Sequence, residues 1–370
     1  MVIYLILVAY ILFLPIIVNL LCKDKTKRHN ATALLSVLGI YLVLALKKYT
    51  VGIDIAGYRQ QYILSSRKAW EDVDYVYFEK GFVFLQKLFS KSGASFQLFT
   101  IFIYLVICIG LFLFIKKYSK NATLSSLIFI CYQFFLFNIT GLRQSMAMGI
   151  CLIAFVVLDA PQNSLRKIRI FRIAVSLVLI LLAVTIHRSA AIFLVVPIIY
   201  LINQRLKRTP YLLYLFLLLL SWAARPLVYS IIEFIFEDST DSVVTLGGNF
   251  IFLILLTAFI AFSTSLKKPY VPSSDIIEDD EAAIRDRLFL LLTLVSLPIY
   301  IILSGSTFLR ASMYFSLFFI VALPNATKKW RPFEKTLIEL LLIVFFVLFF
   351  YFDALEPAKF DICPYTFFWK

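Results

Sequence analysis

The sequence predicts an all-α, polytopic integral membrane protein with about 12 transmembrane helices. Of its 370 residues, 62% are hydrophobic and 38 are Phe, and the mean hydropathy is +0.91. Such a composition leaves too little polar surface for a soluble globule. The apolar runs are apolar on every side, whereas the strands of an outer-membrane barrel alternate between polar and apolar residues.

A hydrocarbon core roughly 30 Å thick is crossed by about 20 apolar residues of helix. On this length scale the chain contains twelve apolar runs, at 2–21, 31–48, 96–115, 121–138, 142–158, 173–187, 189–203, 211–236, 249–266, 288–304, 309–323 and 336–352. The runs at 142–158, 189–203 and 309–323 are short, so tilted, broken or re-entrant segments are expected there, and the span count lies at roughly 10–14. The first run has no positively charged flank before it and is expected to be a retained helix, not a cleaved signal.

The orientation follows from the distribution of Lys and Arg. Alternate loops hold 22 of the 36 basic residues, in six clusters within 23–28, 116–120, 166–172, 205–208, 267–287 and 328–335. The positive-inside rule makes these loops cytoplasmic, so both termini face outward. The net charge of +14 then reflects topology and contact with anionic lipid headgroups. No nucleic-acid-binding motif is present, and no nucleic-acid partner is expected.

A single transmembrane domain is expected over residues 1–370. It carries an external loop at 49–95, a cytoplasmic loop at 267–287 and an external tail at 354–370. The external loop mixes carboxylates with aromatic rings between Trp70 and Glu79, a combination that sugar-binding clefts use. Helical spacing of Phe and Leu predicts an interfacial helix near 81–90.

Three arginines, Arg143, Arg188 and Arg310, lie at the ends of apolar runs on the predicted external face. Arginines inside or beside a bilayer are usually retained for function. His187 adjoins Arg188 and is one of only two histidines; it and Asp54 are the candidate bases. The competing interpretations are snorkelling arginines and a hairpin turn at 187–188.

A further arginine, Arg225, precedes Pro226 within a long apolar run. Because a proline kinks a helix and exposes its backbone, this arginine is expected to line a cavity. The five cysteines are unpaired by spacing and are expected to be buried free thiols. The sequence has no motif for a metal and implies no cofactor. The one DxD segment, Asp72-Val73-Asp74, lies in the external loop, where cytosolic nucleotide sugars do not reach.

The order of motifs resembles the EpsG-like and Wzy-type polysaccharide polymerases of bacterial envelopes, over nearly the whole chain. The motifs are Gly52-Ile53-Asp54 with Tyr58, Glu79-Lys80-Gly81-Phe82, Gly141-Leu142-Arg143-Gln144, Ile186-His187-Arg188-Ser189-Ala190, Arg310 with Tyr314, and Pro364-Tyr365. In that family a Thr commonly stands where this chain has Ile53. A role for a hydroxyl at that position is therefore not carried over.

The resemblance implies a GT-C-like helical bundle around an external-facing cavity, in the bacterial inner membrane. The implied activity is metal-independent, inverting glycosyl transfer on the periplasmic side. It moves a growing O-antigen or exopolysaccharide chain from undecaprenyl diphosphate to the nonreducing end of a new lipid-linked repeat unit. The implied partners are undecaprenyl-diphosphate-linked oligosaccharides, the bilayer and a chain-length regulator. The implied catalytic residues are His187 and Asp54, and the implied substrate-binding residues are Arg143, Arg188, Arg310, Arg225, Tyr58, Gln144, Tyr314 and Tyr365.

Two alternatives share the lipid-linked substrate. An O-antigen ligase has the same donor and differs only in its acceptor. A flippase also presents cations to a diphosphate, but transporters usually show repeated halves and charges reachable from both sides, and the sequence shows no such repeat. An O-acyltransferase takes its cofactor from the cytoplasm, whereas His187 is assigned outside. A purely structural or receptor role leaves the external arginines unexplained.

Overall fold

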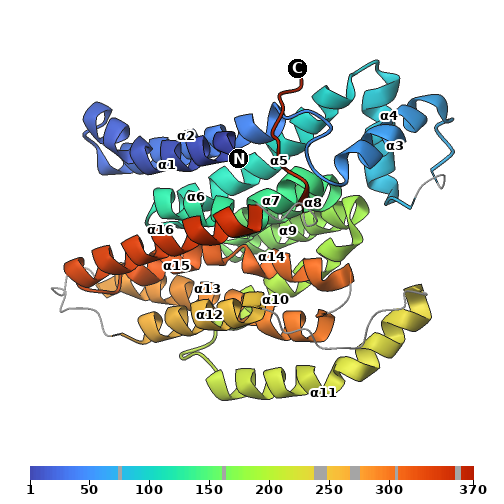
Figure 1. The fold of residues 1–370 in the computed structure, drawn as a ribbon. Helices are drawn as coiled ribbons and strands as arrows, with labels where there is room; N and C mark the ends of the chain where they lie inside the picture. The colour runs from blue at the N-terminus through green and yellow to red at the C-terminus, as the bar shows by residue number, and fades with distance from the viewer. Residues whose placement is uncertain (74–76, 161–163, 237–247, 267–275, 305–306, 355–359) are drawn as a thin grey trace. The chain divides into compact units, whose positions relative to one another are not determined.

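A computed structural model describes residues 1–73, 77–160, 164–236, 248–266, 276–304, 307–354 and 360–370. Nearly all of these residues lie in helices (Figure 1). The only β-type pairing within the described residues is an isolated antiparallel bridge between Lys47 and Phe367. The predicted all-α class is therefore confirmed.

The membrane-spanning character is also confirmed. Among the described residues seven helices are long and apolar enough to cross a bilayer: α1 (Val2–Leu21), α2 (Lys25–Ala45), α5 (Phe96–Tyr118), α9 (Arg166–Ile186), α11 (Tyr211–Phe236), α13 (Ile276–Leu303) and α16 (Pro332–Ala354). The number rises to nine if each of two bent pairs counts as one span. Three shorter apolar segments remain: α8 (Leu142–Leu158), Arg188–Asn203 and Phe250–Ser265. Together these occupy the twelve expected runs, but the three shorter segments are below the length of a full span.

Run 121–138, expected as one continuous segment, is broken in the structure. α6 (Ala122–Cys131) and α7 (Phe134–Thr140) meet at an angle of 53°. Gln133, between them, has a φ of 42°, in the left-handed region, where a non-glycine residue cannot continue a right-handed helix. The short run at 309–323 is bent as well, by 40°, between Leu309–Ser316 and α15 (Phe319–Thr327).

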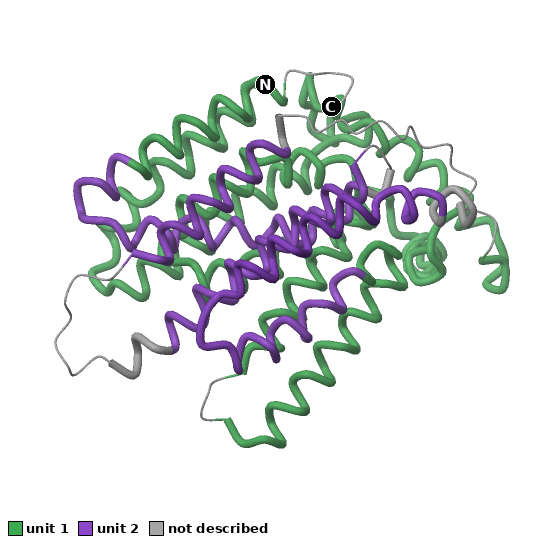
Figure 2. The backbone as a smooth tube through the Cα atoms, turned by 90° about the horizontal axis from the view of Figure 1, so that it is seen from below, with its two compact units in different colours: residues 1–191, 338–370 green, residues 192–337 purple. Residues whose placement is uncertain are grey.

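The chain divides into two compact units, coloured separately in Figure 2. Unit 1 comprises Met1–Ala191 and Ile338–Lys370, and unit 2 comprises Ile192–Leu337. The expectation of a single domain stays a prediction.

In unit 1, α8 packs between α5 and α9, and α2 packs on the opposite side of α5. α8 is buried on nearly every side. Its approach to α5 is close because both helices have a glycine at the crossing: a Cβ on Gly149 would lie 2.6 Å from Ile107 Cα, and a Cβ on Gly110 would lie 2.5 Å from the Gly149 carbonyl oxygen. Small residues at such crossings let helix backbones pack in van der Waals contact within a membrane.

The external loop predicted at 49–95 contains two helices. α4 (Lys80–Lys91) matches the helix expected near 81–90, and it leaves Phe84 57% exposed. α3 (Ile55–Arg67) was not expected. The fully buried ammonium of Lys87 joins α4 to the segment after α3, since it donates to the carbonyl oxygens of Ala69, Trp70 and Asp72.

The C-terminal tail is fastened to the chain just after α2. Four backbone hydrogen bonds of 2.8–3.1 Å connect residues 46–53 with residues 360–368, namely Lys48 N–H to Thr366 O, Phe368 N–H to Leu46 O, Gly52 N–H to Asp361 O and Ile53 N–H to Phe360 O. The Tyr365 hydroxyl donates to the Val43 carbonyl at 2.9 Å. The tail therefore fixes the turn that leads into α3.

In unit 2, α13 packs against α10 (Val195–Asn203), α11, α12 (Gly248–Ser265) and α15. A buried ion pair of 2.7 Å between Lys329 and Asp286 ties the end of α15 to α13. Residues 276–287, predicted to belong to a cytoplasmic connector, form the start of α13. Residues 267–275 of that connector lie outside the described chain.

The crossing of α5 and α8 yields a stability prediction. Gly149→Ala should destabilise the protein by about 1–3 kcal/mol, because the new methyl group overlaps the α5 backbone. Gly57→Ala is the matched control: Gly57 lies within α3, and a Cβ there meets nothing within 4 Å, so a gain of about 0.4–1 kcal/mol is expected. Thermal unfolding of the detergent-solubilised variants measures both. Equal unfolding midpoints for the two variants would contradict the close crossing.

Candidate functional site

A buried carboxylate, Glu79, organises the candidate site. Glu79 directly precedes α4, and its side chain is 9% exposed. Its Oε2 accepts a hydrogen bond of 2.6 Å from Nη1 of Arg143. Its Oε1 lies 3.1 Å from Nδ1 of His187 and accepts a hydrogen bond of 2.9 Å from the backbone N–H of Arg188. One carboxylate therefore joins α4 to α8 and to the end of α9, all within unit 1.

Arg143 lies in the first turn of α8, and its side chain is 21% exposed. Its guanidinium carbon lies 4.3 Å from the centroid of the Phe78 ring, in a cation–π contact. Its Nε also lies 3.4 Å from the Tyr58 hydroxyl. The guanidinium group of Arg143 is thus held in place by Glu79, Phe78 and Tyr58 together. A guanidinium plane fixed in this way favours bidentate contact with phosphate oxygens.

His187 ends α9, and Arg188 begins the 3-10 helix η1 (Arg188–Leu194). An ionised carboxylate can only accept hydrogen bonds, so Nδ1 of His187 carries the proton that Glu79 receives. In the neutral ring this leaves the lone pair on Nε2, which has no hydrogen-bond partner among the described residues. The Arg188 guanidinium is exposed and likewise has no partner within the described part of the chain.

The surroundings of Glu79 keep it ionised. Burial by itself would raise its pKa, but the hydrogen bonds from His187 and from the Arg188 backbone, with the charge of Arg143, outweigh burial and lower the pKa to about 2. Burial raises the pKa of the neighbouring Tyr58 above its ordinary value, against the opposing effect of Arg143. At neutral pH the site therefore holds a carboxylate and a neutral phenol.

The Gly52-Ile53-Asp54 turn supplies Asp54 and Tyr58. Gly52 has a φ of 104°, a conformation that suits glycine, and Asp54 is the exposed residue that precedes α3. Its carboxylate makes no ion pair or hydrogen bond with the described residues, but it is near enough to Tyr58 to influence that residue's pKa. The turn thus places Asp54 one helical turn from Tyr58, which contacts Arg143.

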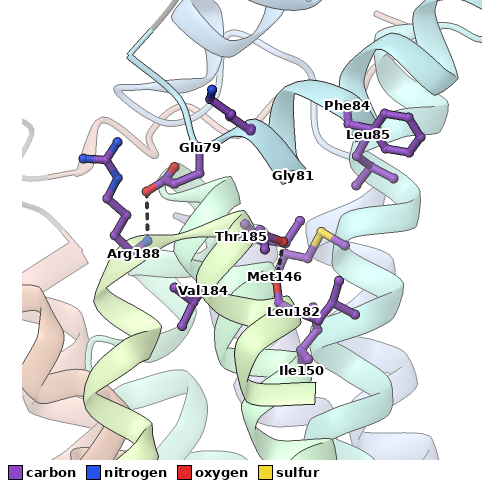
Figure 3. A pocket seen from close by; sticks show the side chains of 12 residues that line it. Glu79, Gly81, Phe84, Leu85, Met146, Ile150, Leu182, Val184, Thr185 and Arg188 are labelled. Atoms are coloured by element: carbon purple, nitrogen blue, oxygen red, sulfur yellow. Dashed lines mark hydrogen bonds between the residues drawn. The ribbon is translucent and has the colours of Figure 1, made fainter. Parts of the chain in front are cut away.

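A pocket of 840 Å³ adjoins this cluster (Figure 3). Glu79 and Arg188 lie together at one side of it, while Phe84, Met146 and Ile150 lie across from them. Gly81 permits the close approach of α4 to α9 that forms the pocket, because a Cβ there would lie 2.7 Å from the Thr185 carbonyl oxygen. The pocket is charged at one side and otherwise mainly apolar.

The sequence matches the EpsG family over residues 30–367. The chain belongs to the EpsG family. This family comprises polysaccharide polymerase-type membrane proteins of a glycosyltransferase-like kind. Comparisons with curated proteins and with solved structures gave no significant match.

The structure brings five predicted residues of this EpsG family member into one region of unit 1: Asp54, Tyr58, Arg143, His187 and Arg188. Gln144 is buried beside Arg143 on α8. Tyr365, also predicted to bind substrate, uses its hydroxyl to hold the tail on α2, which favours a packing role.

The other predicted residues belong to unit 2. Arg225 is buried on α11, and its Nη2 donates to the Ser304 carbonyl at 2.9 Å, just beyond the end of α13. This contact favours a packing role for Arg225. Arg310 is exposed on η3 (Thr307–Ser312). Tyr314 is fully buried, with its ring centroid 6.3 Å from that of Phe193. Substrate-binding roles for Arg310 and Tyr314 stay predictions.

Glu79 was given no individual role by sequence reasoning, although its motif was noted. One signal in the sequence could have identified it. Two arginines and a histidine that are predicted to lie together require a nearby carboxylate to balance their charge. Glu79 lies between Phe78 and the start of a predicted helix. Within the described residues no group of three or more His, Cys, Asp and Glu side chains could hold a metal ion. Asp74 of the DxD segment lies outside those residues.

The lowered pKa of Glu79 predicts a pH-dependent stability. Its ordinary value is 4.5, so the stabilisation from its ionised form is fully present above about pH 4.5 and is lost as the pH falls towards 2. It amounts to roughly 3 kcal/mol. Wild type and Glu79→Gln should therefore differ most in unfolding midpoint at pH 6 and converge on acidification. Glu71→Gln, in the same external segment but exposed, should track wild type throughout. A constant gap between wild type and Glu79→Gln from pH 6 to pH 3 would contradict the assignment.

Proposed function

We propose that this EpsG family protein is an O-antigen or exopolysaccharide polymerase. It transfers a growing glycan from undecaprenyl diphosphate to the nonreducing end of a new lipid-linked repeat unit, on the periplasmic face of the bacterial inner membrane. The observation that carries the proposal is the group of residues at Glu79: an oriented histidine beside the guanidinium of Arg188, which has no partner among the described residues, at the charged side of a mainly apolar pocket.

In the proposed step, a sugar hydroxyl of the acceptor attacks the anomeric carbon of the donor. Its proton passes to Nε2 of His187, whose imidazolium is stabilised by Glu79 through Nδ1. A base oriented by a carboxylate is the arrangement that activates hydroxyl nucleophiles in other enzymes. The new glycosidic bond forms as the anomeric C–O bond to the diphosphate breaks, so a single displacement inverts the anomeric centre.

The departing diphosphate gathers the electron pair of the broken bond. The guanidinium of Arg188 is available for it, and Arg143 adds a second cation whose charge is partly balanced by Glu79. Donors fixed in place before the reaction stabilise developing charge better than reorganising water. Asp54 and Tyr58 are proposed to contact the sugar through their carboxylate and hydroxyl oxygens.

The general base is tested first. His187→Ala should lower the rate of polymerisation by about 10²–10⁴-fold while the protein remains in the membrane. His29→Ala, which removes the other histidine of the chain, should leave polymer unchanged. The readout is the surface polysaccharide of a deletion strain complemented with each variant, resolved on a gel. Wild-type polymer from His187→Ala would remove His187 from the mechanism.

The same gel separates the proposal from its alternatives. In the deletion strain a polymerase defect leaves a single repeat unit attached to its anchor, whereas loss of every unit indicates a flippase or a ligase. Arg143→Ala and Arg188→Ala should reproduce the polymerase defect. Lysine at either position should restore little polymer, because the point charge of an ammonium group does not reproduce the planar, bidentate guanidinium. Arg67→Ala, at the exposed end of α3, is the control.

A further inference from the structure

The pocket beside Glu79 has a gradient of polarity along its length. Its charged residues are Glu79, Lys80 and Arg188, and the remainder of its lining is almost entirely apolar, from α4, α8 and α9. The carboxylate of Glu79 is already engaged by Arg143 and His187. The positive charge available to a ligand at this side includes that of Arg188, whose guanidinium has no partner among the described residues.

The positions of the lining residues along their helices give the pocket a direction. Arg143 lies in the first turn of α8, and Ile150 lies seven residues further on, so a rise of about 1.5 Å per residue separates them by about 10 Å along the helix. Leu182 likewise lies one turn before the end of the membrane-spanning helix α9. The apolar part of the pocket thus extends from the ends of these helices towards their middles, that is, from headgroup depth into the hydrocarbon region.

The pocket is bordered by exposed apolar side chains. Phe84 on α4 is 57% exposed and Leu182 on α9 is 49% exposed. Its volume of 840 Å³ lies in the range of about 300–1,000 Å³ that holds a small-molecule ligand, and it is too large to be filled by headgroup oxygens alone. A ligand that matches it has an anionic head and a hydrocarbon chain.

We infer that this pocket between α4, α8 and α9 binds the first isoprene units of a polyprenyl-diphosphate substrate, with the diphosphate at Arg188. The inference rests on the proposed function for the identity of the lipid, and on the charge and depth of the pocket for its placement. An isoprenoid chain bound here places its diphosphate beside the imidazole of His187. The pocket then helps to set the position of the anomeric carbon, because it holds the lipid next to the diphosphate to which the sugar is attached.

Two adjacent leucines provide a matched test. Leu182 lines the pocket, and Leu181 is exposed on the same helix without lining it. Leu182→Trp narrows the pocket, whereas Leu181→Trp adds the same bulk outside it. Binding of undecaprenyl phosphate to the purified full chain, measured by native mass spectrometry, should weaken at least tenfold in Leu182→Trp and stay within twofold of wild type in Leu181→Trp. Equal binding by both variants would overturn the inference.

The choice of probes distinguishes the sources of the anion. Phosphatidylglycerol offers a phosphate on two acyl chains, and inorganic diphosphate offers the head alone. The inference requires undecaprenyl phosphate to bind more tightly than either, and Arg188→Ala to weaken it. If phosphatidylglycerol binds as tightly as undecaprenyl phosphate, and Leu182→Trp weakens that binding too, the pocket is an ordinary phospholipid site and the inference is wrong. If inorganic diphosphate binds as tightly as the lipid, the isoprenoid chain does not contribute to binding and the inference is wrong.

A second measurement uses the wild-type protein, so its result does not depend on whether a variant folds. A polyprenyl phosphate with a photoreactive group in its first isoprene units should crosslink to peptides from 80–91, 142–158 or 166–186, and crosslinks confined to other segments would overturn the inference. If the protein binds lipid in this pocket but deletion of its gene leaves the polymer intact, the inference is retained and the proposed function is rejected. Loss of polymer on deletion, with no effect of Leu182→Trp on lipid binding, would do the reverse.

Discussion

The structure of the site depends on one buried carboxylate. Glu79 accepts hydrogen bonds from Arg143 on α8 and from His187 and Arg188 at the end of α9, while it lies at the start of α4 itself. Its two oxygens offer about four acceptor positions, and three donors occupy them. A buried carboxylate without such donors would be neutralised instead. The three helices are therefore held together by the same charge that orients the catalytic candidates.

The contacts of Glu79 also give the two arginines different environments. Arg143 is balanced by Glu79 and supported by Phe78 and Tyr58, so it is fixed in place but partly neutralised. Arg188 contributes its backbone to Glu79 and leaves its guanidinium unpaired within the described chain. One arginine thus shapes the site and the other supplies uncompensated positive charge. The proposed diphosphate leaving group would use both, since position and charge each lower the cost of separating it from the sugar.

The polar residues of the candidate site lie at the ends of apolar helices. α8 is too short for a full span and begins at Leu142, next to Arg143, and α9 ends at Ile186, next to His187. Broken helices and helix ends are tolerated in membranes where protein or an aqueous cavity surrounds them. The tail, fastened along residues 46–53, fixes the turn that brings Asp54 and Tyr58 to the same level.

The sequence by itself determined the fold class and the positions of the apolar helices, and it predicted residues of the candidate site, because the length of apolar runs and the placement of charges are local properties of the chain. It also grouped Arg143, Arg188 and Arg310 with His187, and of these Arg143, His187 and Arg188 meet at Glu79. It did not determine that 121–138 is bent at Gln133, that Arg225 and Tyr365 have packing contacts, or that Glu79 unites the cluster. The contacts of Glu79, Arg225 and Tyr365 join groups that are 64 to 322 residues apart along the chain. Only the tertiary structure decides such contacts, because burial and hydrogen bonding between distant helices leave no periodic signal in the sequence.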